Sequence, residues 1–237
     1  MKRTLLTLTS LLLLAAFGTE AGARDFSFRD EVLHYSVRHS FFPGNIGSMI
    51  FYGKDSDDTY RVDATLTASI GGLYTLDCNY GSRFRKDAVL TPVQASREHV
   101  EKKYWAKGRY DWTAPGVVRI DVTKSSRAPR NETLQWAGTV RDLLGMIWWL
   151  RMQDYGKGVD HSTDALLLDH SPIPVRITSA ERKTLRHDGK SVQAIEVTLS
   201  HEGKEALSLT LTDDAQRTPL KFSIALPFGT IKGSLKK

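Results

Sequence analysis

The sequence predicts a mainly β protein in which a long antiparallel sheet curves into a half-barrel or an open barrel. Apolar and polar residues alternate over most of the chain, which is the period of strands with one buried face. Short connections separate ten or more such runs, which favours antiparallel pairing and a sheet that curls. One segment, residues 139–152, has clear helical periodicity. We expect this main helix to pack on the concave side of the sheet.

The first 23 residues are typical of a signal peptide. Lys2 and Arg3 form a basic start, an apolar core follows from residue 5 to 17, and Ala21-Gly22-Ala23 supplies the small residues that signal peptidase reads. The core is too short for a stable transmembrane anchor. We therefore expect cleavage after Ala23, export to the periplasm, and a single β-rich domain over residues 24–237.

Composition narrows the classes of partner. The formal net charge is +6, a mild excess that in an exported protein favours anionic envelope surfaces and gives no reason to expect nucleic acid. The one cysteine, Cys78, excludes an intramolecular disulfide. We expect its thiol to be buried, and an intermolecular partner is the alternative.

The residues before the helix are predicted to form strands. Glu31–His39 shows the pattern, because Leu33, Tyr35 and Val37 alternate with a mostly polar set. Pro43-Gly44-Asn45 predicts a turn, and residues 124–131 predict a polar loop. Residues 69–78 fit either an extended segment or a short second helix. The other strands expected here are residues 46–52, 58–68, 80–86, 93–107 and 117–124.

The predicted helix has the sequence TVRDLLGMIWWLRM. Thr139 and Asp142 resemble a capping box at its start. Met146 and Trp149 project away from the apolar face, so they predict either a second packing surface or contact with a ligand, partner or membrane. Arg151 falls on the apolar face, where a charge needs a partner or a route to water. The residues of the apolar face are Val140, Leu143, Leu144, Ile147 and Leu150.

Further strands are predicted after the helix. Asp188-Gly189 is a strong hairpin signal between two of them. Asp213 and Asp214, followed by Arg217, predict a turn with a local ion pair. The expected strands are residues 164–169, 174–185, 191–200, 206–212, 219–226 and 230–235.

Three segments of the chain carry a family resemblance. They are DEVLHYSV at residues 30–37 followed by Gly47, the segment from Asp142 to Arg151, and LTDDAQRTPLK at residues 211–221 followed by GTIKGSL at residues 229–235. In this order they resemble the bacterial exported-protein family known as domain of unknown function 3108 (DUF3108). The usual glycine before the first-strand glutamate is Asp30 here.

The resemblance implies a fold and no agreed activity. The expected shape is a curved antiparallel sheet with helices on its concave side. That shape is similar to periplasmic lipoprotein carriers of the LolA/LolB type, which hold acyl chains. Because fold does not determine function, this likeness is an analogy.

Catalytic signals are weak. The sequence has no Gly-x-Ser-x-Gly, His-Glu-x-x-His, Walker-type or Cys-x-x-Cys motif. Asp160-His161 and Asp169-His170 have a spacing that matches no common metal site. His99 lies in a strongly charged strand that is typical of a solvated face. We therefore expect no enzyme activity, no metal and no cofactor.

A binding function fits the predicted fold better, because curled sheets enclose apolar cavities that suit acyl chains. In this hypothesis the helix contributes the ligand contacts, with Arg151 meeting an anionic headgroup. The alternative is an envelope protein that acts through protein–protein contacts near Trp149, with no small ligand. A hydrolase of envelope polymers would need a polar cleft with a perturbed carboxylate. The candidate ligand-binding residues are Leu143, Met146, Ile147, Trp148, Trp149 and Arg151.

Overall fold

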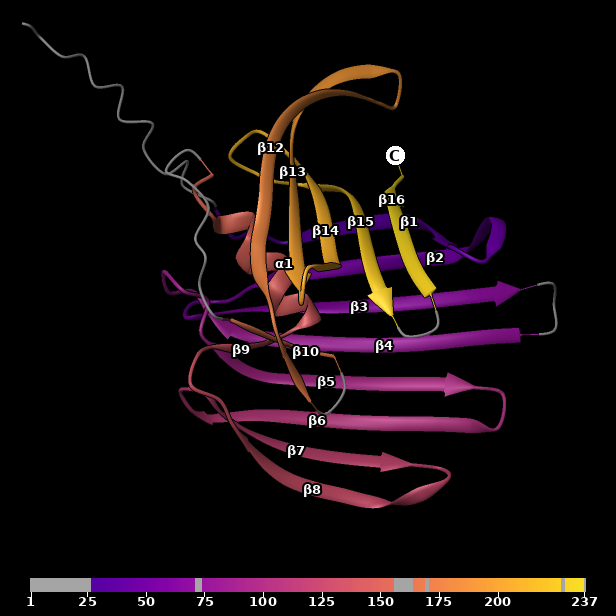
Figure 1. The fold of residues 1–237 in the computed structure, drawn as a ribbon, viewed down its shortest axis with the longest axis vertical. Helices are drawn as coiled ribbons and strands as arrows, with labels where there is room; N and C mark the ends of the chain where they lie inside the picture. The colour runs from indigo at the N-terminus through magenta and orange to yellow at the C-terminus, as the bar shows by residue number, and fades with distance from the viewer. Residues whose placement is uncertain (1–26, 71–73, 156–163, 169–170, 227–228, 237) are drawn as a thin grey trace, which may run out of the picture.

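The computed structural model describes residues 27–70, 74–155, 164–168, 171–226 and 229–236. Thirteen strands form one antiparallel sheet in the order β12-β13-β14-β15-β16-β1-β2-β3-β4-β5-β6-β7-β8. The sheet is strongly curved and open, with β12 and β8 as its edges (Figure 1). The predicted fold class is confirmed.

The strand bounds follow the alternation of the sequence. The first eight strands are β1 (Glu31–His39), β2 (Phe42–Asp55), β3 (Thr59–Ile70), β4 (Tyr74–Arg85), β5 (Pro92–Glu101), β6 (Tyr104–Ala114), β7 (Val117–Lys124) and β8 (Arg127–Gln135). After the helix come β12 (Arg176–His187), β13 (Lys190–His201), β14 (Lys204–Thr212), β15 (Pro219–Leu226) and β16 (Gly229–Leu235).

The first strand lies in the middle of the sheet. β1 pairs with β2 on one side and with the last strand, β16, on the other, so that Tyr35 faces both Met49 and Leu235. The strands that follow β1 and those that precede β16 form the two limbs of the curve (Figure 1). The two limbs face each other across the concave side.

A small second sheet positions the helix. β9 (Val140–Asp142) pairs in parallel with β10 (Ala165–Leu167), and β11 (Pro172–Pro174) pairs antiparallel with β10. The helix α1 (Leu143–Met152) begins directly after β9 and lies inside the curve of the large sheet (Figure 1). Because sheet surrounds it, every residue from Leu144 to Arg151 is buried.

The helix starts later than its periodicity suggests. The predicted start at Thr139 is wrong, because residues 140–142 are held extended by pairing with β10. Asp142 is itself the N-cap residue, and its Oδ2 accepts from the backbone N–H of Leu144 and Gly145. A Cβ at position 145 would lie 2.9 Å from Asp142 Oδ1, so glycine permits this close cap.

Other local predictions differ from the structure. Residues 43–45 lie inside β2, and the turn falls at Ser40 and Phe41. The predicted single strand 93–107 is a hairpin, with Lys102 in the left-handed region at φ 50°. Most of the predicted loop 124–131 belongs to β8, whose polar residues lie on an exposed edge. In the described part of residues 69–78 the chain is extended and shows no second helix.

Several predictions at the other turns and in the core agree. The Asp188-Gly189 hairpin joins β12 to β13. Arg217 Nη1 lies 3.3 Å from Asp213 Oδ1 in the predicted turn ion pair. Cys78 is buried, and burial raises the pKa of its thiol. The predicted signal peptide, residues 1–23, lies outside the described residues.

Candidate functional site

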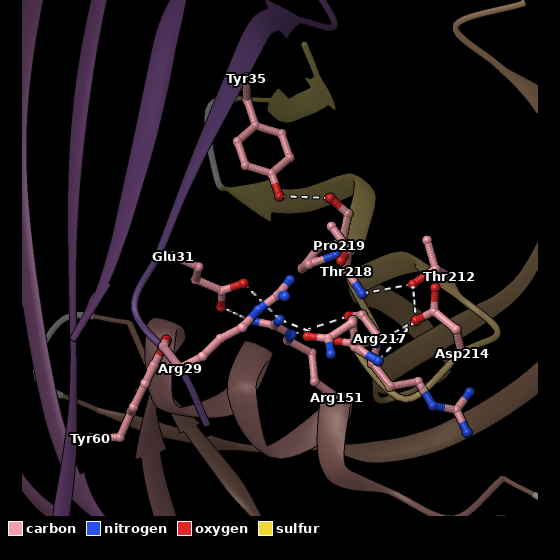
Figure 2. A network of polar contacts seen from close by, with 11 residues as sticks. Arg29, Glu31, Tyr35, Tyr60, Arg151, Thr212, Asp214, Arg217, Thr218 and Pro219 are labelled. Atoms are coloured by element: carbon pink, nitrogen blue, oxygen red, sulfur yellow. Dashed lines mark hydrogen bonds and ion pairs between the residues drawn. The ribbon is translucent and has the colours of Figure 1, made fainter. Parts of the chain in front are cut away.

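The end of the helix is held by a buried arginine, Arg151. Its guanidinium forms a two-pronged ion pair with Glu31 of β1, in which Nη1 meets Oε1 and Nη2 lies 3.1 Å from Oε2. Nε donates to the carbonyl of Arg217 and Nη2 to that of Gln216, each at 3.1 Å. Figure 2 shows the guanidinium between Glu31 and the loop from β14 to β15, which contains Gln216 and Arg217. We call these four residues and Trp148 the Arg151 network.

Ring and backbone contacts complete the Arg151 network. The guanidinium carbon lies 4.8 Å from the centre of the Trp148 ring. The loop that supplies the two carbonyls is itself fixed, because Asp214 Oδ1 accepts from the backbone N–H of Gln216 and Arg217. The side chain of Arg151 is 1% exposed and that of Glu31 is 6% exposed. A buried charge with this many partners is satisfied by the protein itself.

A second buried arginine lies just before the start of the helix. Arg141 Nη1 donates to Asp164, and Nη2 donates to the carbonyl of Val89 at 2.6 Å. Its guanidinium carbon lies 4.8 Å from the centre of the Trp149 ring. Among the described residues its Nε finds no hydrogen-bond partner. Trp148 and Trp149 therefore each contact a guanidinium through the ring. Of the two arginines, Arg151 is held by two carbonyls as well as an acid, whereas Arg141 donates to one carbonyl.

The N-cap aspartate is electrostatically unusual. Ser82 Oγ donates to Asp142 Oδ1 at 2.8 Å, in addition to the two backbone N–H groups at the other oxygen. Burial nevertheless raises the pKa of Asp142 to about 6, and the hydrogen bond from Ser82 is the largest effect in the opposite direction. The carboxyl therefore changes charge near neutral pH.

A cavity opens beside the helix start. Its volume is about 190 Å³, and we call it the Leu143 cavity. Strands of both limbs contribute to its wall, so it lies within the curve of the sheet. It is lined by Met49, Leu66, Tyr80, Ala95, Ser96, Arg97, His99, Tyr110, Asp142, Leu143, Leu144, Leu167, Leu168, Ile224, Leu226 and Ile231.

The wall of the Leu143 cavity is mostly apolar with a few polar groups on one side. Arg97 is half-buried, and its Nη1 donates to the carbonyl of Leu168 at 2.9 Å. His99 lies beside it on β5, with Nε2 3.6 Å from Glu101. Burial raises the pKa of the Tyr80 phenol, which is therefore neutral at ordinary pH. An apolar group could occupy this space with a polar or anionic end near Arg97.

A second hollow lies at another part of the sheet, where β6 turns into β7. Its volume is about 600 Å³, and Trp112 and Trp136 line it together with backbone of residues 113–116 and 137–139. The indole of Trp112 is fixed by its hydrogen bond to the carbonyl of Val140 at 2.8 Å. Arg85, Thr91 and Thr113 are among the polar residues that line it.

Comparisons with known proteins agree with the fold. The family model described as "Protein of unknown function (DUF3108)" matches residues 33–236. The chain belongs to this family. No curated protein matches it. A crystal structure of a β-barrel-like protein of domain of unknown function DUF1849 from Brucella abortus has a TM-score of 0.61, with 9% identity over 90% of this chain and 98% of that one. At that identity the likeness shows a shared fold alone.

The residues that carry the DUF3108 resemblance converge in space. Glu31 comes from the first segment, Arg151 ends the second, and Gln216 and Arg217 belong to the third. These positions are distant in the chain and meet in the Arg151 network (Figure 2). Each of the three segments therefore contributes at least one residue to the contacts that hold the end of the helix in the sheet.

The structure separates the predicted ligand-binding residues. Leu143 lines the cavity. Met146, Ile147, Trp148 and Trp149 are packed in the core, with exposed fractions of 0 to 5%. Of the two alternatives for Met146 and Trp149, the structure agrees with the second packing surface, because both side chains are buried. Arg151 is paired with the carboxylate of Glu31 on β1, so the partner that its position on the apolar face requires comes from the protein itself.

Sequence reasoning did not find the other cavity residues. Arg97, Leu66 and Ile224 come from β5, β3 and β15, and they share a wall only because the sheet curves. Strand alternation marks each of them as inward or outward, but it does not show which strands face each other. Only the three-dimensional curvature brings them together.

In the described residues, no group of three or more His, Cys, Asp or Glu could hold a metal ion. Asp160, His161, Asp169 and His170 lie outside the described residues. No helix in the described part of the chain is long and apolar enough to cross a membrane.

Proposed function

We propose that this protein is exported to the periplasm and binds an amphiphile in the Leu143 cavity. The ligand would have one short alkyl chain or a small ring, with a polar or anionic end. The observation that carries this proposal is the cavity of about 190 Å³, apolar on most sides and bordered by Arg97. Residues of the helix start and of both sheet limbs would contact the ligand.

The size of the cavity supports a small ligand. Apolar protein cavities of about 150 Å³ hold a molecule the size of benzene. A cavity of about 190 Å³ therefore suits one ring or a short chain, and a two-chain lipid would have to extend beyond it. The cavity volume therefore limits the proposed ligand to one short apolar group, which is smaller than the lipids and lipoproteins of the carrier analogy.

The charge at the cavity supports an anionic end. The guanidinium of Arg97 is half-buried in the wall, where charge-assisted hydrogen bonds are stronger than in water. Asp142 lies on the same cavity, and its carboxyl loses its negative charge below about pH 6. We therefore expect anionic ligands to bind more tightly at pH 5 than at pH 7.

Native mass spectrometry of the protein purified from the periplasm tests this function. A bound amphiphile of one-to-one stoichiometry, identified after organic extraction, is the expected result. Octanoate and octanol are then offered to the ligand-free protein. Arg97→Gln should weaken octanoate binding by about tenfold, equal to 1.4 kcal/mol, because it removes a charged donor. Octanol binding should change little, and this neutral ligand is the matched control.

A clean mass with no uptake of either compound would contradict the binding function. The same spectra test export, because the expected chain begins at Arg24. A mass that still includes residues 1–23 would contradict cleavage. The alternative of a purely protein-binding role relied on an exposed apolar surface near Trp149, whose side chain is 5% exposed. For this reason we place the cavity first.

A further inference from the structure

Exposed apolar side chains gather at one rim of the sheet. Phe41 is 72% exposed and Phe42 39% exposed in the turn between β1 and β2. Val100 and Trp105, at 39% and 37%, are cross-strand partners beside the turn between β5 and β6. Phe41 and Phe42 both lie against the ring of His39 and form one patch, and exposed apolar patches can mark a contact with a membrane or a partner.

These turns lie along one side of the molecule. β1–β2, β5–β6 and β7–β8 all turn at the same ends of their strands, on the right in Figure 1. The β1–β2 and β5–β6 turns are four strand spacings apart, roughly 20 Å along the sheet. The β7–β8 turn contacts the β5–β6 hairpin, because Ser125 N–H donates to the carbonyl of Trp105 at 2.9 Å. We call these three turns and the strand ends beside them the basic rim.

The charges of the basic rim are mainly positive. Lys102 and Lys103 form the β5–β6 turn, and Lys124 and Arg127 flank the β7–β8 turn. The acids on neighbouring positions are Asp77 and Glu101, and Glu101 lies 3.6 Å from the ring of His99. The basic groups therefore outnumber the acidic ones along this side.

The parts of β1 and β2 that lie next to Phe41 and Phe42 contain no acids. Residues 32–54 and 215–237 contain no Asp or Glu, and β1, β2, β15 and β16 from these stretches are neighbours in the sheet. Arg38 and Lys232 are direct cross-strand partners, and both are exposed. Two like charges in that position repel, so an anion that bridges them would stabilise the pair.

The opposite rim, which we call the acidic rim, carries more acids than the basic rim, and two of them are paired, Asp55 with Lys86 and Asp30 with Lys54. The turn between β2 and β3 carries Asp55, Asp57 and Asp58. Three exposed apolar residues, Val32, Tyr52 and Val89, also lie toward that rim. Apolar exposure is therefore present at both rims, and charge distinguishes them.

We propose that the basic rim docks on an anionic membrane surface, with Phe41 and Phe42 entering the interface. Lysines and arginines near an anionic bilayer attract it electrostatically, while aromatic side chains settle at the headgroup level. The acidic rim would point away from the lipid, so the charge difference also orients the molecule.

The docked orientation brings the Leu143 cavity close to the membrane. Ile231 lines the cavity and is the cross-strand partner of His39. The ring of His39 lies 5.5 Å from that of Phe41 and 5.3 Å from that of Phe42. The aromatic turn and the cavity wall are therefore connected by one side chain. Docking does not depend on the cavity being filled, so the two proposals can fail separately.

Vesicle sedimentation tests the docking. The mature protein, which is expected to begin at Arg24, is mixed with vesicles of phosphatidylcholine alone or of phosphatidylcholine with phosphatidylglycerol, at low and high salt. We expect binding to the anionic vesicles at low salt and its loss at high salt. Lys102→Glu with Lys103→Glu should weaken the binding by about tenfold or more, and Phe41→Ser with Phe42→Ser should also weaken it.

Tyr52→Ser is the matched control, because this side chain is 43% exposed near the acidic rim. It should bind anionic vesicles as the unchanged protein does. The rim variants should still take up octanoate in vesicle-free solution, which separates this result from the proposed function. Equal binding to neutral vesicles, absence of binding to anionic ones, or an effect of Tyr52→Ser as large as that of the rim variants would overturn the docking proposal.

Discussion

The two ends of the helix α1 have different chemistry. At its C-terminal end, Arg151 is paired with Glu31 and donates to two carbonyls of the β14–β15 loop. At its N-terminal end, Asp142 has a raised pKa, and Leu143 lies on a cavity. The first end satisfies its polar groups within the protein, whereas the second leaves space and a titrating carboxyl.

This difference separates structure from function. Four residues that carry the family resemblance meet at the C-terminal end, where they join β1, the helix and a distant loop (Figure 2), while others, such as Asp142 and Leu143, lie at the N-terminal end. A charged residue on an apolar helix face, such as Arg151, suggests a ligand contact. Here its guanidinium binds other residues of the protein. The candidate binding site lies at the other end and includes residues outside the recognised segments, such as Arg97 and Leu66.

Breaking the Arg151 network should have the largest effect on stability. Arg151→Met leaves the buried Glu31 carboxylate and two carbonyls without their donor, so we expect a loss of about 3–5 kcal/mol in the free energy of unfolding. Urea denaturation followed by circular dichroism measures it. The control is Arg61→Met, because Arg61 pairs with Asp63 on the surface and is 63% exposed; its loss should be at most about 1 kcal/mol.

A double variant sharpens this result. Glu31→Gln combined with Arg151→Met removes both charges, so part of the lost stability should return. Losses that simply add in the double variant would show that the two side chains do not act as a pair. That outcome would contradict the account of the C-terminal end.

Arg141→Met should have a smaller effect. Arg141 is also buried against an acid and a tryptophan, but its Nε has no partner in the described residues and it donates to only one carbonyl. We expect a loss of about 2–3 kcal/mol, below that of Arg151→Met. The same urea titration compares the two. A loss larger than that of Arg151→Met would reverse the ranking of the two ends.

Asp142→Asn should have an effect on stability that depends on pH. The folded pKa of about 6 lies above the ordinary value of 3.8. Protonation of Asp142 therefore favours the folded state fully below pH 3.8, and this contribution is lost as the pH rises to about 6. Asparagine keeps an N-cap oxygen and does not titrate. Relative to the unchanged protein, the variant should gain stability between pH 4 and 6.

Urea midpoints measured across this pH range check the prediction. Ser82→Ala serves as the companion variant, since it removes the side-chain donor that favours the ionised form of Asp142. A difference between Asp142→Asn and the unchanged protein that stays constant with pH would contradict the raised pKa at the helix start.

Much of the fold could be predicted from the sequence. Alternation and the Asp188-Gly189 turn predicted antiparallel strands, and the periodicity of residues 139–152 predicted the helix, which begins at Leu143. The sequence signal failed where tertiary pairing overrides local pattern. Residues 140–142 continue the helical periodicity but are held extended by β10, and the polar edge strand β8 has the composition of a loop.

The candidate site was less predictable for a physical reason. Helical periodicity showed which residues share the apolar face of the helix. It did not show that Trp149 and Met146, on the opposite face, are also buried. The need of Arg151 for a partner could be stated from its position, but the choice of Glu31, 120 residues away, depends on the path of the whole sheet. The cavity follows from the curvature of the sheet, which no single segment encodes.

The most direct test compares ligand binding after filling space at each end of the helix. Leu143→Trp places a large ring at the cavity, and Met152→Trp places the same ring at the other end, where the side chain is also half-buried. Octanoate binding is measured by calorimetry on variants whose circular dichroism is unchanged. We predict that Leu143→Trp weakens binding by about tenfold or more while Met152→Trp leaves it within about twofold. Equal affinities in the two variants would contradict a binding site at the start of the helix.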